Sequence, residues 1–206
     1  MAGPSVQSGE ERRVERMSFP PAPAPALAAL CAGGLLLGML PGAPVRASTL
    51  EDIRQLENLI NASGTETVVS GDCPPNHAGY YENDGKTIDR LVICKRNVDM
   101  GDVEAVWEVM AHEATHIMQS CTGSTAISDG QMPRTYRELQ AMAPHYAKLI
   151  HTQYSSSEQR LEAEAFWMEL QSPPMVLELF RRNCAAYLKE GSSGRRQPPP
   201  LSGPGR

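Results

Sequence analysis

The sequence predicts an α+β fold in which a small antiparallel sheet packs on a helix carrying an HExxH motif, and a helical C-terminal half follows. Two observations predict this fold. Apolar residues recur at helical spacing before, within and well after the motif at residues 112–116. Between the first helical segment and the motif, three short runs rich in Val, Ile and Tyr are typical of strands. A length of 206 residues allows one hydrophobic core.

The first 47 residues read as a secretory signal peptide. Three arginines, a Pro/Ala run, an apolar run at 26–40 and small residues up to Ala47 follow one another in the expected order. The apolar run is shorter than the about 20 residues that a membrane-spanning helix needs. We therefore expect cleavage near Ala47 and a secreted or periplasmic chain without stable membrane association. An uncleaved membrane anchor is the alternative.

Residues 48–190 are expected to form the folded domain. An amphipathic helix spans 48–61, with Ser48 or Thr49 as its cap and Gly64 soon after its end. Strands are expected within 65–73, 77–83 and 90–96, and an Asp-Gly turn signal joins the last two. These three strands predict the small antiparallel sheet.

The motif helix is expected at 102–121, followed by a loop at 122–134. A helical segment at 134–154 should be divided at Pro144. The segment 155–171 begins with a capping-box spacing. The last helix, 172–190, has a serine cap followed by proline. Residues 191–206 lack an apolar period and are predicted to be a disordered tail.

Four cysteines remain after the predicted cleavage, and an even number in an exported chain favours disulfides. We expect Cys73 to pair with Cys94 and Cys121 with Cys184, although four cysteines allow three connectivities. Buried free thiols are the alternative. A formal net charge of -5, without a long run of Lys or Arg, argues against nucleic acid as a partner.

His112 and His116 stand four residues apart, and Glu113 directly follows the first of them. On a helix both imidazoles project from one face and can share a metal ion, while Glu113 lies one step round the helix. Both histidines fall opposite the main apolar stripe, as a helix lining a metal-binding cleft requires. The motif therefore predicts a zinc site that needs a third protein ligand.

The third ligand is sought among residues that follow the motif. Gln119 and Thr122 occupy the Gly and final His positions of HExxHxxGxxH, which excludes the metzincin pattern. Glu162 and Glu164 are the remaining candidates. Glu162 has apolar helical neighbours and is the predicted ligand, whereas Glu164 is interpreted as a solvated partner of Arg160.

HExxH followed by a glutamate on a later helix resembles the gluzincin zinc metallopeptidases, especially small exported minigluzincin-like proteins of bacterial type. The resemblance covers residues 48–190 in element order and implies a zincin-like domain. It implies that His112, His116 and Glu162 bind Zn²⁺. Glu113 would act as general base, taking a proton from the zinc-bound water as that water attacks a peptide carbonyl. The implied partner is a peptide or protein substrate, held at a strand edge.

Two further roles in such families are open in this chain. A His or Tyr that steadies the oxyanion has three candidates, His145, His151 and Tyr154. An Asp or Asn four residues after the ligand glutamate orients a zinc histidine in several families, and Phe166 stands there instead. The orienting role is therefore unassigned.

Three functions compete on the sequence. The first is an exported zinc-dependent metallopeptidase. The second is a zinc-binding module of zincin fold that lacks proteolysis. The third is a disulfide-stapled helical domain in which HExxH occurs by chance.

Overall fold

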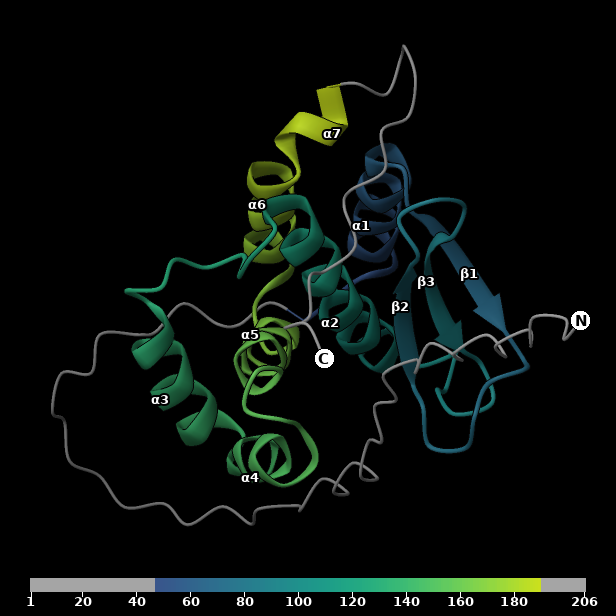
Figure 1. Ribbon diagram of the computed structural model, residues 1–206. Helices are drawn as coiled ribbons and strands as arrows, with labels where there is room; N and C mark the ends of the chain where they lie inside the picture. The colour runs from purple at the N-terminus through teal and green to yellow at the C-terminus, as the bar shows by residue number, and fades with distance from the viewer. Residues whose placement is uncertain (1–46, 190–206) are drawn as a thin grey trace, which may run out of the picture.

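The computed structural model describes residues 47–189, so the predicted signal peptide, apart from Ala47, and the predicted tail at 191–206 lie outside the described residues. Its elements are α1 (Leu50–Ser63), β1 (Glu66–Ser70), β2 (Gly79–Asn83), β3 (Asp89–Cys94), α2 (Val103–Thr122), α3 (Met132–Met142), α4 (Pro144–Gln153), α5 (Gln159–Glu169), α6 (Pro173–Asn183) and α7 (Ala185–Lys189). A small sheet lies beside α2, and the helices that follow α2, from α3 to α7, form the C-terminal half of the described residues (Figure 1). The predicted α+β class is confirmed.

Helix α1 begins at a capping box. The Thr49 side chain accepts a hydrogen bond from the backbone of Asp52, and the Asp52 carboxylate accepts one from the backbone of Thr49. The helix ends at Gly64, whose φ of 104° lies in the left-handed region that glycine adopts without strain. Leu56 and Ile60, on the inward face, are fully buried. Of the two predicted caps, Thr49 is the one used.

The sheet is mixed, so the prediction of an antiparallel sheet was wrong for the pairing of β1 with β3. The strand order is β1-β3-β2, with β3 parallel to β1 and antiparallel to β2. Successive strands still alternate in direction, but β3 lies between the other two. Its run Leu91–Cys94 is buried throughout, whereas β1 is largely half-exposed. The most apolar strand takes the centre, which makes its pairing with β1 parallel.

Strand β2, an edge strand of the sheet within residues 47–189, lies against α2. A Cβ atom placed on Gly79 would stand 2.6 Å from Cγ1 of Val109 and 2.8 Å from the carbonyl oxygen of Val92. Only glycine fits at that distance, so Gly79 allows the strand to approach the motif helix closely.

Helix α2 lies between the sheet and α5, with α3 and α4 beyond α5 (Figure 1). The Asp102 side chain caps its first turn, and Gly123, with a φ of 70°, ends it. The prediction placed the two motif histidines opposite the apolar stripe. In the fold α5 covers that opposite side, so the helix is enclosed on both sides.

The C-terminal half follows the predicted order. Pro144 begins α4 directly after α3, as predicted, because its ring cannot continue a helix. Helix α5 begins at Gln159, later than predicted, although the backbone N–H of Ser155 donates to the Glu158 carboxylate. Ser172 and Pro173 begin α6 as predicted. Within residues 47–189, no helix combines the length and apolar character that a membrane span requires.

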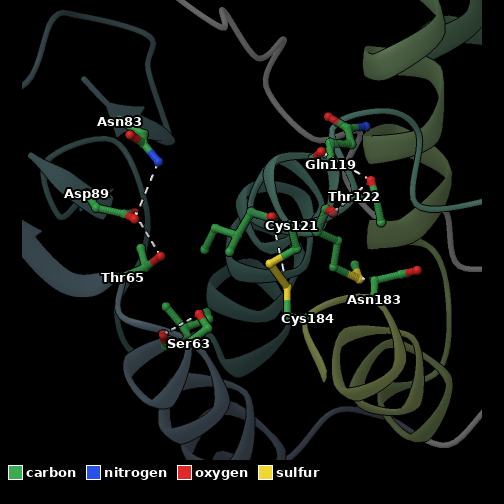
Figure 2. The surroundings of a disulfide bond; sticks show 12 residues. Ser63, Thr65, Asn83, Asp89, Gln119, Cys121, Thr122, Asn183 and Cys184 are labelled. Carbon is green, nitrogen blue, oxygen red and sulfur yellow. Dashed lines mark hydrogen bonds between the residues drawn. A yellow bond between two sulfur atoms is a disulfide. The ribbon is translucent and has the colours of Figure 1, made fainter. Parts of the chain in front are cut away.

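Two disulfides connect these elements, and both predicted pairs are confirmed. Cys73 and Cys94 join the loop after β1 to the end of β3. Cys121 and Cys184 join the last turn of α2 to the end of α6 (Figure 2). The second bond therefore fixes the C-terminal end of the helix that carries the motif.

Candidate metal centre

Three predicted ligands converge between α2 and α5. Nε2 of His112 lies 3.6 Å from Oε2 of Glu162, and Nε2 of His116 lies 3.6 Å from Oε1 of the same carboxylate. The three candidate ligand atoms all lie within 4.8 Å of one another, and all three residues are buried. One turn of α2 and the first turn of α5 thus present two imidazoles and a carboxylate to one point.

This arrangement fits a metal ion. Two histidines and one glutamate form a donor set found in catalytic zinc sites. Nε2 of His116 is buried without a hydrogen bond in the described chain, a costly arrangement that a cation beside it would relieve. Zinc at 2.0–2.2 Å from each ligand in a tetrahedral site separates its ligand atoms by about 3.3–3.6 Å. The two 3.6 Å separations, which end on different oxygens of Glu162, lie at the upper end of that range.

Glu169 orients the first histidine. Its Oε2 lies 3.0 Å from Nδ1 of His112, so this nitrogen donates and Nε2 faces Glu162. Sequence reasoning sought this residue four positions after Glu162 and found Phe166, whose ring packs edge-on against His112 at 4.7 Å between centroids. Glu169 stands two turns after Glu162, on the same face of α5, and this seven-residue spacing was the signal available in the sequence.

Gln119 contacts the second histidine. Its Oε1 lies 2.9 Å from Nδ1 of His116. Sequence reasoning used Gln119 only to exclude the metzincin pattern and missed its contact with His116. Its place three residues after His116, on the same side of the helix, was the available signal.

Glu164 is not the solvated residue that was predicted. It is fully buried, and its carboxylate accepts hydrogen bonds from the backbone N–H groups of Ala126 and Ile127. Arg160 instead contacts Asp129. The helical-wheel interpretation failed because the loop at 123–131 folds over this side of α5 and supplies donors that a wheel cannot show. Glu162, as predicted, is the glutamate that meets the histidines.

A family model described as a domain of unknown function, DUF8637, matches residues 54–185. The chain belongs to the DUF8637 family. The matched residues include both histidines, Glu113 and Glu162, so the candidate centre lies inside the DUF8637 domain. No curated protein and no solved structure matches the chain.

Burial and charge set the protonation of the centre in the metal-free DUF8637 domain. Burial acts to lower the pKa of His112, but hydrogen bonds to Glu162 and Glu169 outweigh it and raise that pKa to about 10. Burial lowers the pKa of His116. In the metal-free domain these shifts favour a charged His112 beside Glu162 and a neutral His116.

Glu113 is fully buried on the side of α2 that faces the sheet. Its Cγ would lie 3.4 Å from a Cβ on Gly79, so it sits against β2. Burial raises the pKa of Glu113 to about 7, although the positive charge of His112 and the backbone of Tyr81 act to lower it. The DUF8637 fold thus holds a carboxyl group with a near-neutral pKa beside the candidate ligands.

The three candidates for oxyanion stabilisation lie on or just after α4. His145 and His151 are exposed, and the ring of His145 packs on Tyr146 with 4.1 Å between centroids. Tyr154 is half-buried, with its ring 6.5 Å from that of Phe166. In the DUF8637 chain, Tyr154 is therefore the candidate whose ring lies against Phe166, and the ring of Phe166 packs against His112.

Proposed function

We propose that this protein is an exported zinc metallopeptidase with a zincin-like fold of the gluzincin type. The observation that carries the proposal is the meeting of the HExxH helix with Glu162 from a later helix. In this proposal His112, His116 and Glu162 hold Zn²⁺, and Glu113 is the general base.

Zinc held there would supply Lewis-acid chemistry, polarising a peptide carbonyl and acidifying the attacking water. Glu113 would take the proton from that water and later return it to the leaving amine. In the metal-free protein burial raises the pKa of Glu113 to about 7, a range that suits a group which must both accept and release a proton. Glu169 would keep the ring of His112 turned toward the metal.

Strand β2 is the proposed place for the substrate backbone. An edge strand can pair with an extended peptide through main-chain hydrogen bonds. The close approach at Gly79 places this strand against α2 next to Glu113. A peptide added to β2 would therefore run alongside the proposed base.

Export is supported by two features of the described chain. Two disulfides fit an oxidising compartment. The backbone nitrogen of Ser48 lies 2.7 Å from Oε1 of Glu104. Cleavage after Ala47 would turn that nitrogen into an ammonium group already placed beside a carboxylate.

A zinc-binding module without proteolysis is the second candidate, and burial favours it. The exposed fraction is 0% for His112 and Glu113, 2% for Glu162 and 7% for His116. A peptidase must admit a substrate carbonyl to its metal, whereas a binding module needs no such access.

The deciding experiment begins with the metal content of the purified protein. Stoichiometric zinc supports both candidates, and its absence after zinc loading rejects both. Turnover of a mixed peptide library is then compared between the wild-type protein and Glu113→Gln. Turnover by the wild type that Glu113→Gln abolishes supports the peptidase. A zinc-loaded wild type that cleaves nothing supports the module.

A further inference from the structure

The side-chain amide of Gln119 has a determined orientation. Its Nε2 donates to the carbonyl oxygen of Leu161 at 3.0 Å and to Oε2 of Glu164 at 2.8 Å. If the amide were turned over, its oxygen would face these two acceptors and two hydrogen bonds would become repulsions. Gln119 therefore presents Oε1, and only Oε1, to His116.

This orientation selects one tautomer of His116. An amide oxygen accepts hydrogen bonds and cannot donate, so the proton of the neutral imidazole is held on Nδ1, 2.9 Å from Oε1 of Gln119. The lone pair then lies on Nε2, the atom 3.6 Å from Glu162. A metal ion binds that form directly, without a change of tautomer.

Glu164 is the anchor of this arrangement. It accepts from Gln119, Ala126 and Ile127, so three donors surround a fully buried carboxylate. Two of the donors belong to the backbone of the loop at 123–131. The same carboxylate thus holds the amide of Gln119 in place and holds that loop on α5.

We propose that Gln119 and Glu164 form a positioning pair that fixes the tautomer and ring orientation of His116 and joins the loop at 123–131 to the metal centre. The proposal rests on the metal-binding part of the proposed function and not on peptidase activity. The proposed pair gives a role to Glu164, which is buried and only two residues from Glu162 but does not belong to the candidate metal ligands.

The first test reads the tautomer directly. Long-range ¹H–¹⁵N spectra of the metal-free, full-length protein distinguish an Nδ1–H from an Nε2–H imidazole. We expect His116 to carry its proton on Nδ1 in the wild type and to lose that preference in Gln119→Leu. A wild-type His116 protonated on Nε2 would overturn the proposal, whatever the variant does.

The second test measures zinc affinity by competition with a chelator. Gln119→Leu and Glu164→Gln should each bind zinc about 10- to 100-fold more weakly, the usual effect of removing a residue that orients a ligand. Glu164→Gln should also speed amide hydrogen exchange at Ala126 and Ile127, since an amide cannot accept all three hydrogen bonds.

Thr122→Val is the matched control. Thr122 lies on the same end of α2 as Gln119 (Figure 2). Its hydroxyl lies within hydrogen-bond distance of the carbonyl oxygens of Met118, Gln119, Ser124 and Thr125, the shortest being 2.8 Å to Ser124, and it touches only the backbone of Gln119, not the side-chain amide or His116. This variant should keep the wild-type tautomer and nearly the wild-type affinity. If it weakens zinc binding as much as Gln119→Leu, general loosening of the loop explains both effects and the pair has no specific role.

Different results would reject the proposed metal centre and the proposed positioning pair. A wild-type protein that binds no zinc rejects the metal centre itself. Unchanged affinity in Gln119→Leu, beside a wild type that does bind zinc, rejects the positioning pair alone.

Discussion

His112 and Glu169 form a buried pair in which Nδ1 of the imidazole lies 3.0 Å from Oε2 of the carboxylate. Glu169 belongs to the helix that also supplies Glu162. One helix therefore provides both the carboxylate that faces Nε2 of His112 and the carboxylate that contacts Nδ1 of the same ring. The orientation of the ring thus depends on the docking of α5 against α2.

Replacement of Glu169 tests this pair. Glu169→Leu removes the acceptor and should weaken zinc binding about 10- to 100-fold. Glu169→Gln keeps an acceptor oxygen but loses the charge, so its effect should be smaller. Chelator competition measures both, with Glu178→Gln on the exposed face of α6 as control. Equal affinity in Glu169→Leu and in the control would show that His112 needs no orienting partner.

Glu162→Gln and Glu113→Gln should separate the ligand from the base. Glu162→Gln should lose most bound zinc and all hydrolysis, because a neutral amide is a poor ligand at this position. Glu113→Gln should retain zinc and lose hydrolysis, since a general base need not touch the metal. Elemental analysis and peptide turnover of the two purified variants check this. Zinc retained by Glu162→Gln would mean that the third ligand is elsewhere.

Zinc affinity should rise with pH. Burial opposes a charge on His112, but its hydrogen bonds to Glu162 and Glu169 prevail and raise its pKa to about 10 in the metal-free protein. The proton must leave Nε2 before a metal can bind there, so each binding event at pH 7 should release a proton from His112. Affinity should then increase up to about tenfold per pH unit from pH 7 toward 9.

Calorimetry in buffers of different ionisation enthalpy counts the released protons. A zinc affinity that is flat across this pH range, with no proton released by the wild type, would contradict the charged state assigned to His112.

The two disulfides should contribute unequally to stability. The cysteines are 63 positions apart for Cys121–Cys184 and 21 for Cys73–Cys94, and closing the longer loop restricts the unfolded chain more. Replacing either pair with serine should cost about 2–4 kcal/mol in the free energy of unfolding, with the larger loss for Cys121–Cys184. Urea unfolding under non-reducing conditions measures both. A pair whose removal changes nothing is not bonded in the folded protein.

Gly79→Ala should destabilise the contact between β2 and α2. The added methyl group would lie 2.6 Å from Cγ1 of Val109, and overpacking of this kind costs about 1–3 kcal/mol. Val109→Ala in the same chain should restore part of the loss, but not all, since the carbonyl oxygen of Val92 also lies too close. Gly130→Ala, at a loop position with open space, is the control. Full stability in Gly79→Ala would place the strand farther from the helix.

Sequence patterns predicted the parts of the fold that depend on local chemistry. The capping box at Thr49, the start of α6 at Pro173 and the break at Pro144 follow from backbone rules that act over a few residues. The order of the strands could not be predicted in this way. It depends on which strand the rest of the molecule buries, and β3 takes the centre because α2 and the other two strands cover it.

The candidate site was predictable where the ligands have fixed spacing. His112 and His116 define a helix face, and the apolar neighbours of Glu162 indicate its burial. The contact of Gln119 with His116 was missed although their spacing on α2 was available. Glu164 escaped prediction because its partners come from a loop and from another helix. A helical wheel contains only the residues of its own helix, so it treated Glu164 as a solvated charge.

The candidate ligands His116 and Glu162 stand 46 residues apart in the sequence, on helices that meet only in the folded chain. An unfolded chain offers the two histidines without the carboxylate, so the complete site comes into being after α2 and α5 have docked. A polypeptide that crosses a membrane unfolded would lack the complete site and would carry no metal ion from the cytoplasm in it. The compartment where this chain folds would then decide which metal it acquires, because availability as well as intrinsic affinity governs occupancy.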